Sequence, residues 1–150
     1  MKRLRIYLDA SVVGGCLDEE FAEESLALIN MGATRRFIFL VSDLLLEELA
    51  NAPGEVKKIV SQLDDGLVEA VSMSEESAAL RDAYIKAGVV GAKHANDAHH
   101  VAIATIAGAD LIVSWNFKHI VHFDKIRLFN AVNLRESYPI IDIRSPMEVV

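Results

Sequence analysis

Apolar residues follow two patterns along the chain, short continuous runs and longer stretches with helical spacing. The continuous runs lie at residues 4–8, 37–41, 68–71 and 111–113 and are typical of strands. Because the longer runs lack a polar face, we expect strands that are covered on both sides, as in a parallel sheet. Residues 140–143 are a further candidate, as a strand added at one edge.

Four stretches between these runs have apolar residues at helical spacing. The predicted helices span residues 19–31, 55–63, 75–87 and 96–107. The last is apolar on nearly every side, which indicates a buried helix, and Gly108 suits its end.

Strands that alternate with helices predict an α/β fold, a three-layer α/β/α sandwich around a mainly parallel sheet with right-handed crossovers. The chain is 52% hydrophobic and 25% charged, which is the composition of a compact globular domain. No repeat, low-complexity stretch or linker divides it, so we expect one domain over residues 1–150.

Charge and cysteine content narrow the functional classes. A net charge of −7 argues against a protein that coats nucleic acid, but a nuclease with a carboxylate pocket stays compatible with it. Cys16 is the only cysteine, so no internal disulfide can form, which favours a reduced, cytoplasmic location. We expect Cys16 to be inert. No apolar run approaches the roughly 18 residues of a membrane span, so no membrane partner is expected.

Polar side chains occur where parallel sheets bind ligands, beyond the carboxyl ends of the strands. Asp9 ends the first strand, and Asn116 follows the strand at 111–113 by three residues. We expect both to face the same edge of the sheet.

Two further acids have apolar neighbours at helical spacing. Glu48 follows the strand at 37–41, and Asp97 begins the helix at 96–107. Stepping about 100° per residue from Leu44 gives Glu48 a place on the apolar side and turns Glu47 away. The residues of that apolar face are Leu45, Leu46, Leu49 and Ala50. Asp97 shares a stripe with Val101 and Ala104 on the buried helix. The sequence therefore predicts inward-facing carboxylates at Glu48 and Asp97.

Carboxylates brought into one pocket repel each other, and protonation or a divalent cation relieves that repulsion. Oxygen ligands favour Mg²⁺ or Mn²⁺, whereas zinc prefers histidine or cysteine. If Asp9, Glu48 and Asp97 meet, we expect a Mg²⁺ or Mn²⁺ site.

Four segments, in order, resemble the acidic motifs of PIN-domain proteins, and most closely those of small stand-alone VapC-like toxins. They are residues 6–13 (IYLDASVV), 41–49 (VSDLLLEEL), 94–102 (HANDAHHVA) and 111–116 (LIVSWN). Each motif alone is weak, but their order is specific, and together they extend over about the whole chain.

The resemblance implies a PIN-like fold and a metal-dependent ribonuclease. Its pattern of acids maps onto Asp9, Glu48, Asp97 and Asn116 as catalytic and metal-binding positions. It also implies an RNA substrate, a protein antitoxin and a homodimer, for which the face of Phe21, Leu26 and Ile29 is one candidate surface. Asn116 departs from the family's usual aspartate, so activity is expected to be low, to rely on one Mg²⁺, or to be lost.

Each of these residues also has an ordinary interpretation. Asp9 and Asn116 suit turns or helix caps, Glu48 can reach solvent, and Asp97 suits a first helical turn. Their shared placement favours a site. We interpret His99 and His100 as packing or supporting groups, because their spacing forms no zinc motif.

Other side chains near the motifs are candidates for RNA contact. The basic ones are Lys93, His94, Lys118, His119, His122, Lys125 and Arg127. Trp115 or Phe117 could stack on a base, although we expect Trp115 to be packed inside. Ser11 and Ser114 are expected to position the pocket or a phosphate rather than attack it.

Three classes of function remain open at this point. The first is a Mg²⁺-dependent endoribonuclease, and the second is a weak or inactive PIN-like module that binds RNA or an antitoxin. A phosphatase or phospho-acceptor domain is disfavoured, because Asp9 lacks a second aspartate two residues later.

Overall fold

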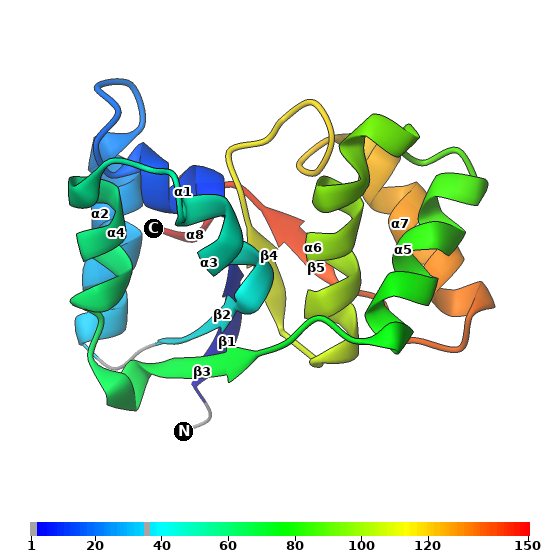
Figure 1. Ribbon diagram of the computed structural model, residues 1–150, viewed down its shortest axis with the longest axis horizontal. Helices are drawn as coiled ribbons and strands as arrows, with labels where there is room; N and C mark the ends of the chain where they lie inside the picture. The colour runs from blue at the N-terminus through cyan, green and yellow to red at the C-terminus, as the bar shows by residue number, and fades with distance from the viewer. Residues whose placement is uncertain (1–2, 35–36) are drawn as a thin grey trace.

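The computed structural model describes residues 3–34 and 37–150 and contains a five-stranded sheet, parallel throughout (Figure 1). The strands are β1 (Leu4–Leu8), β2 (Phe37–Ser42), β3 (Val68–Val71), β4 (Leu111–Val113) and β5 (Asp142–Arg144). Their order across the sheet is β3-β2-β1-β4-β5. The predicted strands are confirmed, and the predicted edge strand is β5, paired parallel with β4.

Eight helices accompany the sheet in the described residues. They are α1 (Ala10–Gly15), α2 (Ala22–Ala33), α3 (Asp43–Leu49), α4 (Gly54–Ser61), α5 (Glu75–Lys86), α6 (Ala95–Ile106), α7 (Phe123–Arg135) and α8 (Pro146–Val149), with short 3₁₀ turns η1 (Asp65–Leu67) and η2 (Ala92–His94). The four predicted helices correspond to α2, α4, α5 and α6 within a few residues. Gly108 has a φ of +71° at the end of α6, as a C-terminal glycine allows.

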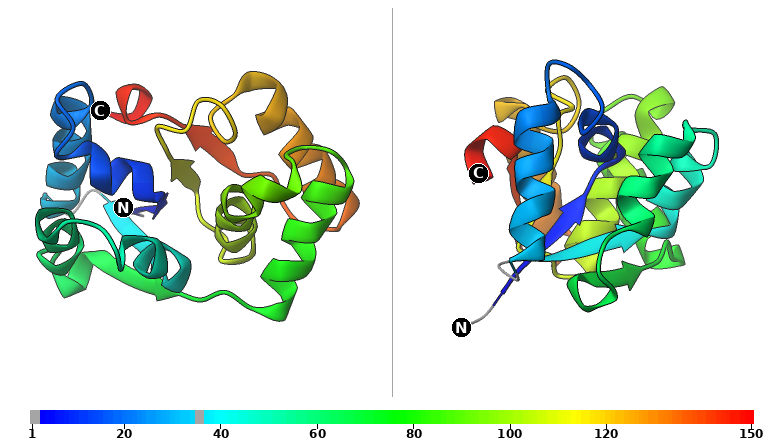
Figure 2. Two further views of the ribbon diagram at one scale, coloured as in Figure 1. Left: turned by 45° about the horizontal axis from the view of Figure 1, so that its top comes forward. Right: turned by 90° about the vertical axis from the view of Figure 1, so that its left-hand side faces the viewer.

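Alternate residues of each central strand contact different helices, which makes three layers. On one face, Tyr7 and Leu40 pack in a core with side chains of α5, α6 and α7. On the other, Ile6 and Phe39 pack in a second core with side chains of α1, α2, α3 and α4. Figure 2 shows the sheet between these helices. The predicted three-layer α/β/α sandwich is therefore confirmed.

The register brings the ends of the central strands to one edge. Leu8 lies beside Val113, and Ser42 beside Val71, so β1, β2 and β4 all finish on the same side of the sheet. The segments that follow are α1, α3 and the loop after β4. This edge therefore receives Asp9, Glu48 and Asn116 from three separate parts of the chain.

The predicted apolar face of α3 is wrong at two positions. Leu44, Leu45 and Leu49 are buried, but Leu46 is 52% exposed and Ala50 is exposed. At about 100° per residue, Leu44, Leu45 and Leu49 cover roughly 140° of the helix, and Leu46 and Ala50 lie beyond this arc. The buried side of α3 (seven residues) is therefore narrower than the predicted one. Within residues 3–34 and 37–150, every helix is too short or too polar to cross a bilayer.

Candidate functional site

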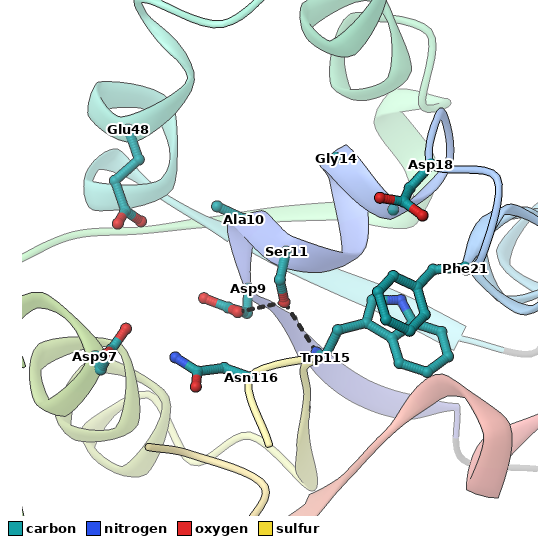
Figure 3. A pocket seen from close by; sticks show the side chains of 11 residues that line it. Asp9, Ala10, Ser11, Gly14, Asp18, Phe21, Glu48, Asp97, Trp115 and Asn116 are labelled. Atoms are coloured by element: carbon teal, nitrogen blue, oxygen red, sulfur yellow. Dashed lines mark hydrogen bonds between the residues drawn. The ribbon is translucent and has the colours of Figure 1, made fainter. Parts of the chain in front are cut away.

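The four predicted site residues line one open pocket at the carboxyl edge of the sheet (Figure 3). Asp9 comes from the end of β1, Glu48 from α3, Asp97 from the first turn of α6 and Asn116 from the loop after β4. The pocket has a volume of about 640 Å³, within the range of sites that bind small ligands. The remaining lining residues are Ala10, Ser11, Gly14, Gly15, Asp18, Phe21 and Trp115.

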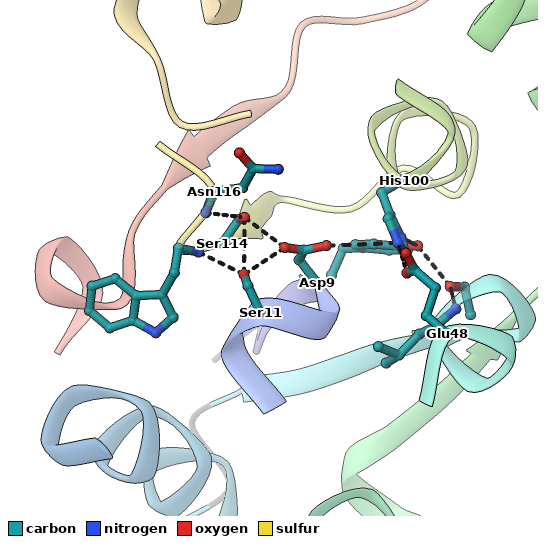
Figure 4. A network of polar contacts seen from close by, with 10 residues as sticks. Asp9, Ser11, Glu48, His100, Ser114 and Asn116 are labelled. Atoms are coloured by element: carbon teal, nitrogen blue, oxygen red, sulfur yellow. Dashed lines mark hydrogen bonds and ion pairs between the residues drawn. The ribbon is translucent and has the colours of Figure 1, made fainter. Parts of the chain in front are cut away.

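Asp9 is 5% exposed and is held by two serine hydroxyls (Figure 4). Ser11 Oγ and Ser114 Oγ donate to its Oδ2 at 2.6 and 2.8 Å. The Asp9 side chain makes no cap hydrogen bond to α1, so the alternative interpretation as a helix cap is not what the structure shows. The prediction that Ser11 and Ser114 position the pocket fits these contacts.

The same hydroxyls are fixed in turn by the backbone of the loop after β4. Trp115 N–H donates to Ser11 Oγ and Asn116 N–H donates to Ser114 Oγ, both at 2.9 Å. With these lone pairs occupied, each hydroxyl directs its hydrogen to Asp9. These two donated hydrogen bonds fix the orientation of the Asp9 carboxyl group.

Glu48 extends into the pocket from an otherwise exposed position on α3. Its side chain is 29% exposed, and its carboxylate hydrogen-bonds Nε2 of His100, which is fully buried. The predicted orientation of Glu48 toward the site is thus right, and the apolar burial predicted around it is only partial. Glu47 is exposed, as the helical phase indicates.

His100 joins the two carboxylates and was not predicted as part of the site. Its Nε2 lies 3.7 Å from Asp9 Oδ1, and its Nδ1 hydrogen-bonds the hydroxyl of Tyr7 at 2.5 Å. Burial lowers the pKa of His100, but the hydrogen bond with Glu48 and the charge of Asp9 outweigh it, and the pKa is raised. The neighbouring carboxyl groups therefore stabilise the protonated form of His100.

Asp97 is half-buried on the opposite side of the pocket from Glu48 (Figure 3). Burial raises its pKa first, and the negative charge of Asp9 raises it further. The side-chain amide of Asn116 faces the carboxyl and works against both effects. This is the electrostatic signature of carboxyls that share a pocket, and a bound cation would relieve it.

Asn116 has the cap-like role of its ordinary interpretation. Its Oδ1 accepts the backbone N–H of His119 at 2.9 Å, which stabilises the turn after β4. The carbonyl oxygen that would ligate a metal thus already has a hydrogen-bond partner. Its role as a ligand stays a prediction.

The aromatic and basic neighbours differ from the sequence expectations in part. Trp115 is 6% exposed, donates from Nε1 to Ser25 Oγ and stacks on Phe21, so base stacking by Trp115 is wrong and its predicted packing is confirmed. Phe117 is 48% exposed and remains a candidate. Lys125 donates one hydrogen bond from Nζ to the carbonyl of Val89 and keeps its charge and two further N–H donors, so it also remains a candidate.

The candidate dimer face of Phe21, Leu26 and Ile29 is partly used by the core, and its role in a dimer stays a prediction. Phe21 and Ile29 are only partly exposed and pack against the core, while Leu26 is 39% exposed. The basic candidates between Lys118 and Arg127 lie on a segment that is partly packed. It includes Ile120, which is fully buried, and the start of α7.

Among the residues that the structure describes, two groups of side chains could hold a cation. The first is Asp9, Glu48 and His100, and the second is His94, Asp97 and His119; in each, the ligand atoms lie within 4.8 Å of one another. The first set of two carboxylates and one imidazole fits a divalent ion, and its nitrogen favours Mn²⁺ over Mg²⁺. A signal for His100 existed in the sequence, since it follows Asp97 by three residues on one helix face.

Comparisons with known proteins show similarity of fold. No protein family and no curated protein matches the sequence. Among solved structures, the chain is similar to VapBC2 from Rickettsia felis, bound to a DNA fragment from its promoter (13% identity, TM-score 0.57), and to FitAcB from Neisseria gonorrhoeae (17% identity, TM-score 0.56). Each alignment covers 95% of this chain and 98% of the other. At these identities the likeness establishes a shared fold.

Proposed function

We propose that this protein is a metal-dependent endoribonuclease and the toxin of a toxin–antitoxin pair. The observation that carries the proposal is the pocket in which carboxylates from β1, α3 and α6 converge, at Asp9, Glu48 and Asp97. The order of the four acidic motifs, which resembles that of VapC-like proteins, supports the proposal. So does the similarity in fold to VapBC2 and FitAcB.

The residues of the chain prepare the pocket for a divalent cation. Ser11 and Ser114 orient the carboxyl group of Asp9, and His100 fixes the carboxylate of Glu48. When bound, a divalent cation lowers the pKa of a coordinated water and offsets charge on a phosphoryl group. Hydrolysis of a phosphodiester then needs no protein nucleophile, in keeping with the serine hydroxyls being committed to Asp9.

RNA binding to an acidic protein requires positive charge near the pocket. Lys93 and Lys118 are exposed and lie on segments that also carry site residues, just before α6 and just after Asn116. Phe117 offers an exposed ring on the same loop. We propose these three side chains as contacts for the strand, with Mg²⁺ or Mn²⁺ in the carboxylate pocket.

A protein antitoxin and a homodimer belong to the same proposal. VapBC2 was crystallised with DNA from its own promoter. By analogy, we propose that this chain forms a complex with an antitoxin. Co-purification with the product of a neighbouring small gene tests this part independently of catalysis.

The activity is tested by cleavage of single-stranded RNA with Mg²⁺ or Mn²⁺. We expect Asp9→Asn and Glu48→Gln each to lower the rate by about 100-fold or more, because each removes a charge from the cation site. Glu47→Gln is the matched control, since Glu47 is exposed on the same helix, and it should cleave like the native protein. Equal cleavage by native protein and Asp9→Asn would overturn the proposal.

The alternative is a module that binds RNA or an antitoxin without cleaving. The cap-like role of Asn116 favours it, because the position lacks the charge that is usual in the resembled family. RNA binding without cleavage at saturating Mn²⁺ would support this alternative, and cleavage that depends on Asp97 would exclude it.

A further inference from the structure

His94, Asp97 and His119 form a second ligand-type group, distinct from the group at Asp9. Each offers a ligand atom within 4.8 Å of the other two, and His94 Nδ1 lies 3.8 Å from Asp97 Oδ2. The two imidazole rings are stacked, with centroids 3.6 Å apart. Side chains from η2, α6 and the loop after β4 thus meet at one point.

The local fold holds these residues in place without using their ligand atoms fully. The backbone of His119 is fixed by Asn116, whose side chain and carbonyl anchor the turn after β4. His94 closes the η2 turn three residues before Asp97. The turn and the helix start therefore bring both imidazoles to the Asp97 carboxyl.

An independent observation points to a missing partner at this group. His119 Nδ1 is buried, and among the described residues it has no hydrogen-bond partner. Buried polar atoms in proteins nearly always have one.

We propose that His94, Asp97 and His119 bind a divalent transition-metal ion of the Zn²⁺ or Co²⁺ type. Two imidazoles and a carboxylate suit these ions, whereas Mg²⁺ prefers oxygen ligands alone. Ligand bonds of about 2.0–2.1 Å place the donors of one tetrahedral ion roughly 3.4 Å apart. The His94–Asp97 pair, at 3.8 Å, therefore needs to close by a fraction of an ångström, and the other two pairs, within 4.8 Å, by at most about 1.4 Å. Three protein ligands leave a coordination position open, which is typical of catalytic rather than structural zinc sites.

The new site shares Asp97 with the carboxylate pocket. Asn116 carries no charge, whereas the resembled family usually has an aspartate at this position. A second cation, beside the one proposed at Asp9, would therefore be held by the two histidines instead of that aspartate. Metal binding by these three side chains requires no nuclease activity. Only a role in phosphodiester cleavage rests on the proposed function.

The wild-type chain provides the first test, through the ring-nitrogen NMR signals of its histidines during a titration with Zn²⁺. We expect the ring signals of His94 and His119 to shift together within the first equivalents, with assignments taken from single variants. Shifts confined to His100, or no shift at His94 and His119, would overturn the proposal.

Calorimetric titration with Zn²⁺ provides the second test. His94→Gln and His119→Gln should each weaken binding by about 10-fold or more, while His122→Gln, an exposed histidine outside the group, should bind like the native protein. Asp9→Asn should retain binding at the histidine site even though it removes the proposed activity. Equal affinity of His119→Gln and His122→Gln would contradict the assignment.

Discussion

The two carboxylate oxygens of Asp9 have different surroundings. Oδ2 accepts from the hydroxyls of Ser11 and Ser114, whereas Oδ1 lies 3.7 Å from Nε2 of His100 (Figure 4). Nε2 of His100 thus lies beside the carboxyl groups of both Asp9 and Glu48, and their presence raises the pKa of His100. A divalent cation that binds these two carboxylates competes with the His100 proton, so metal binding is expected to release protons.

Asn116→Asp tests the effect of the missing charge. One oxygen of the new carboxylate can keep the His119 N–H, while the other faces Asp97 in place of the amide that now lowers the Asp97 pKa. We expect the metal-free variant to lose about 1 kcal/mol of stability and to bind Mn²⁺ about 10-fold more tightly. Chemical denaturation with and without Mn²⁺ measures both effects; unchanged stability together with unchanged affinity would contradict this account.

The Cys16 thiol gives a prediction about pH. Burial raises its pKa to about 11, and the thiol donates to the carbonyl of Val12. Since only the thiolate is nucleophilic, alkylation of the folded protein at pH 8 should be much slower than alkylation in urea.

The same shift contributes to stability with a definite sign. A pKa that is raised by folding adds stability that is complete below the unfolded value of about 8.5, and this stability is lost as the pH rises through about 11. Cys16→Ala should therefore flatten the fall in stability over this range. Equal alkylation rates for folded and unfolded protein at pH 8 would refute the predicted protection of the Cys16 thiol.

Single residues were predictable where a strand end or a helical phase fixed their direction. Asp9 and Glu48 were found in this way, because the end of a parallel strand and a 100° step are properties of the chain alone. His100 was interpreted as a packing or supporting group, which its hydrogen bond with Glu48 fits, and His119 as a basic candidate. Their place in ligand groups was not predicted, because it depends on contacts between segments far apart in sequence. The hydrogen bond that Asn116 Oδ1 accepts from the His119 backbone also depends on the folded turn after β4.

Helix α7 shows what element prediction overlooked. Its buried side carries Ile126, Phe129 and Val132 at a spacing of three, so a periodic signal was present within a segment interpreted by its charges. Helix α1 has only six residues, too few for a periodic pattern. Helix α6, apolar on nearly all sides, was predicted within a residue at each end.

The contact of α2 with β2 predicts a large difference between two glycine substitutions. A Cβ at Gly32 would lie 2.2 Å from the ring of Phe39, which is fully buried, whereas one at Gly14 in α1 would meet nothing within 4 Å. We expect Gly32→Ala to destabilise the protein by about 1–3 kcal/mol. Gly14→Ala should be neutral or stabilise it by up to about 1 kcal/mol. Urea denaturation of both variants distinguishes them, and equal stabilities would contradict the packing described for α2.

At the scale of the whole molecule, strand order explains why distant acids converge. The central strands β2, β1 and β4 are neighbours, although residues 43–110 separate β2 from β4 in the chain. The segments that follow them open on one edge, where the pocket lies (Figure 3). The general rule for parallel sheets predicted this edge, and only the folded chain shows how the histidines complete it.

Crystals soaked in Mn²⁺ test the central claim most directly, because anomalous scattering locates the ion without any assay of activity. We predict an anomalous peak between the side chains of Asp9, Glu48 and His100 that is weak or absent in Asp9→Asn crystals grown under the same conditions. A native crystal with no Mn²⁺ at this position, or a peak of equal strength in the Asp9→Asn crystal, would contradict the account.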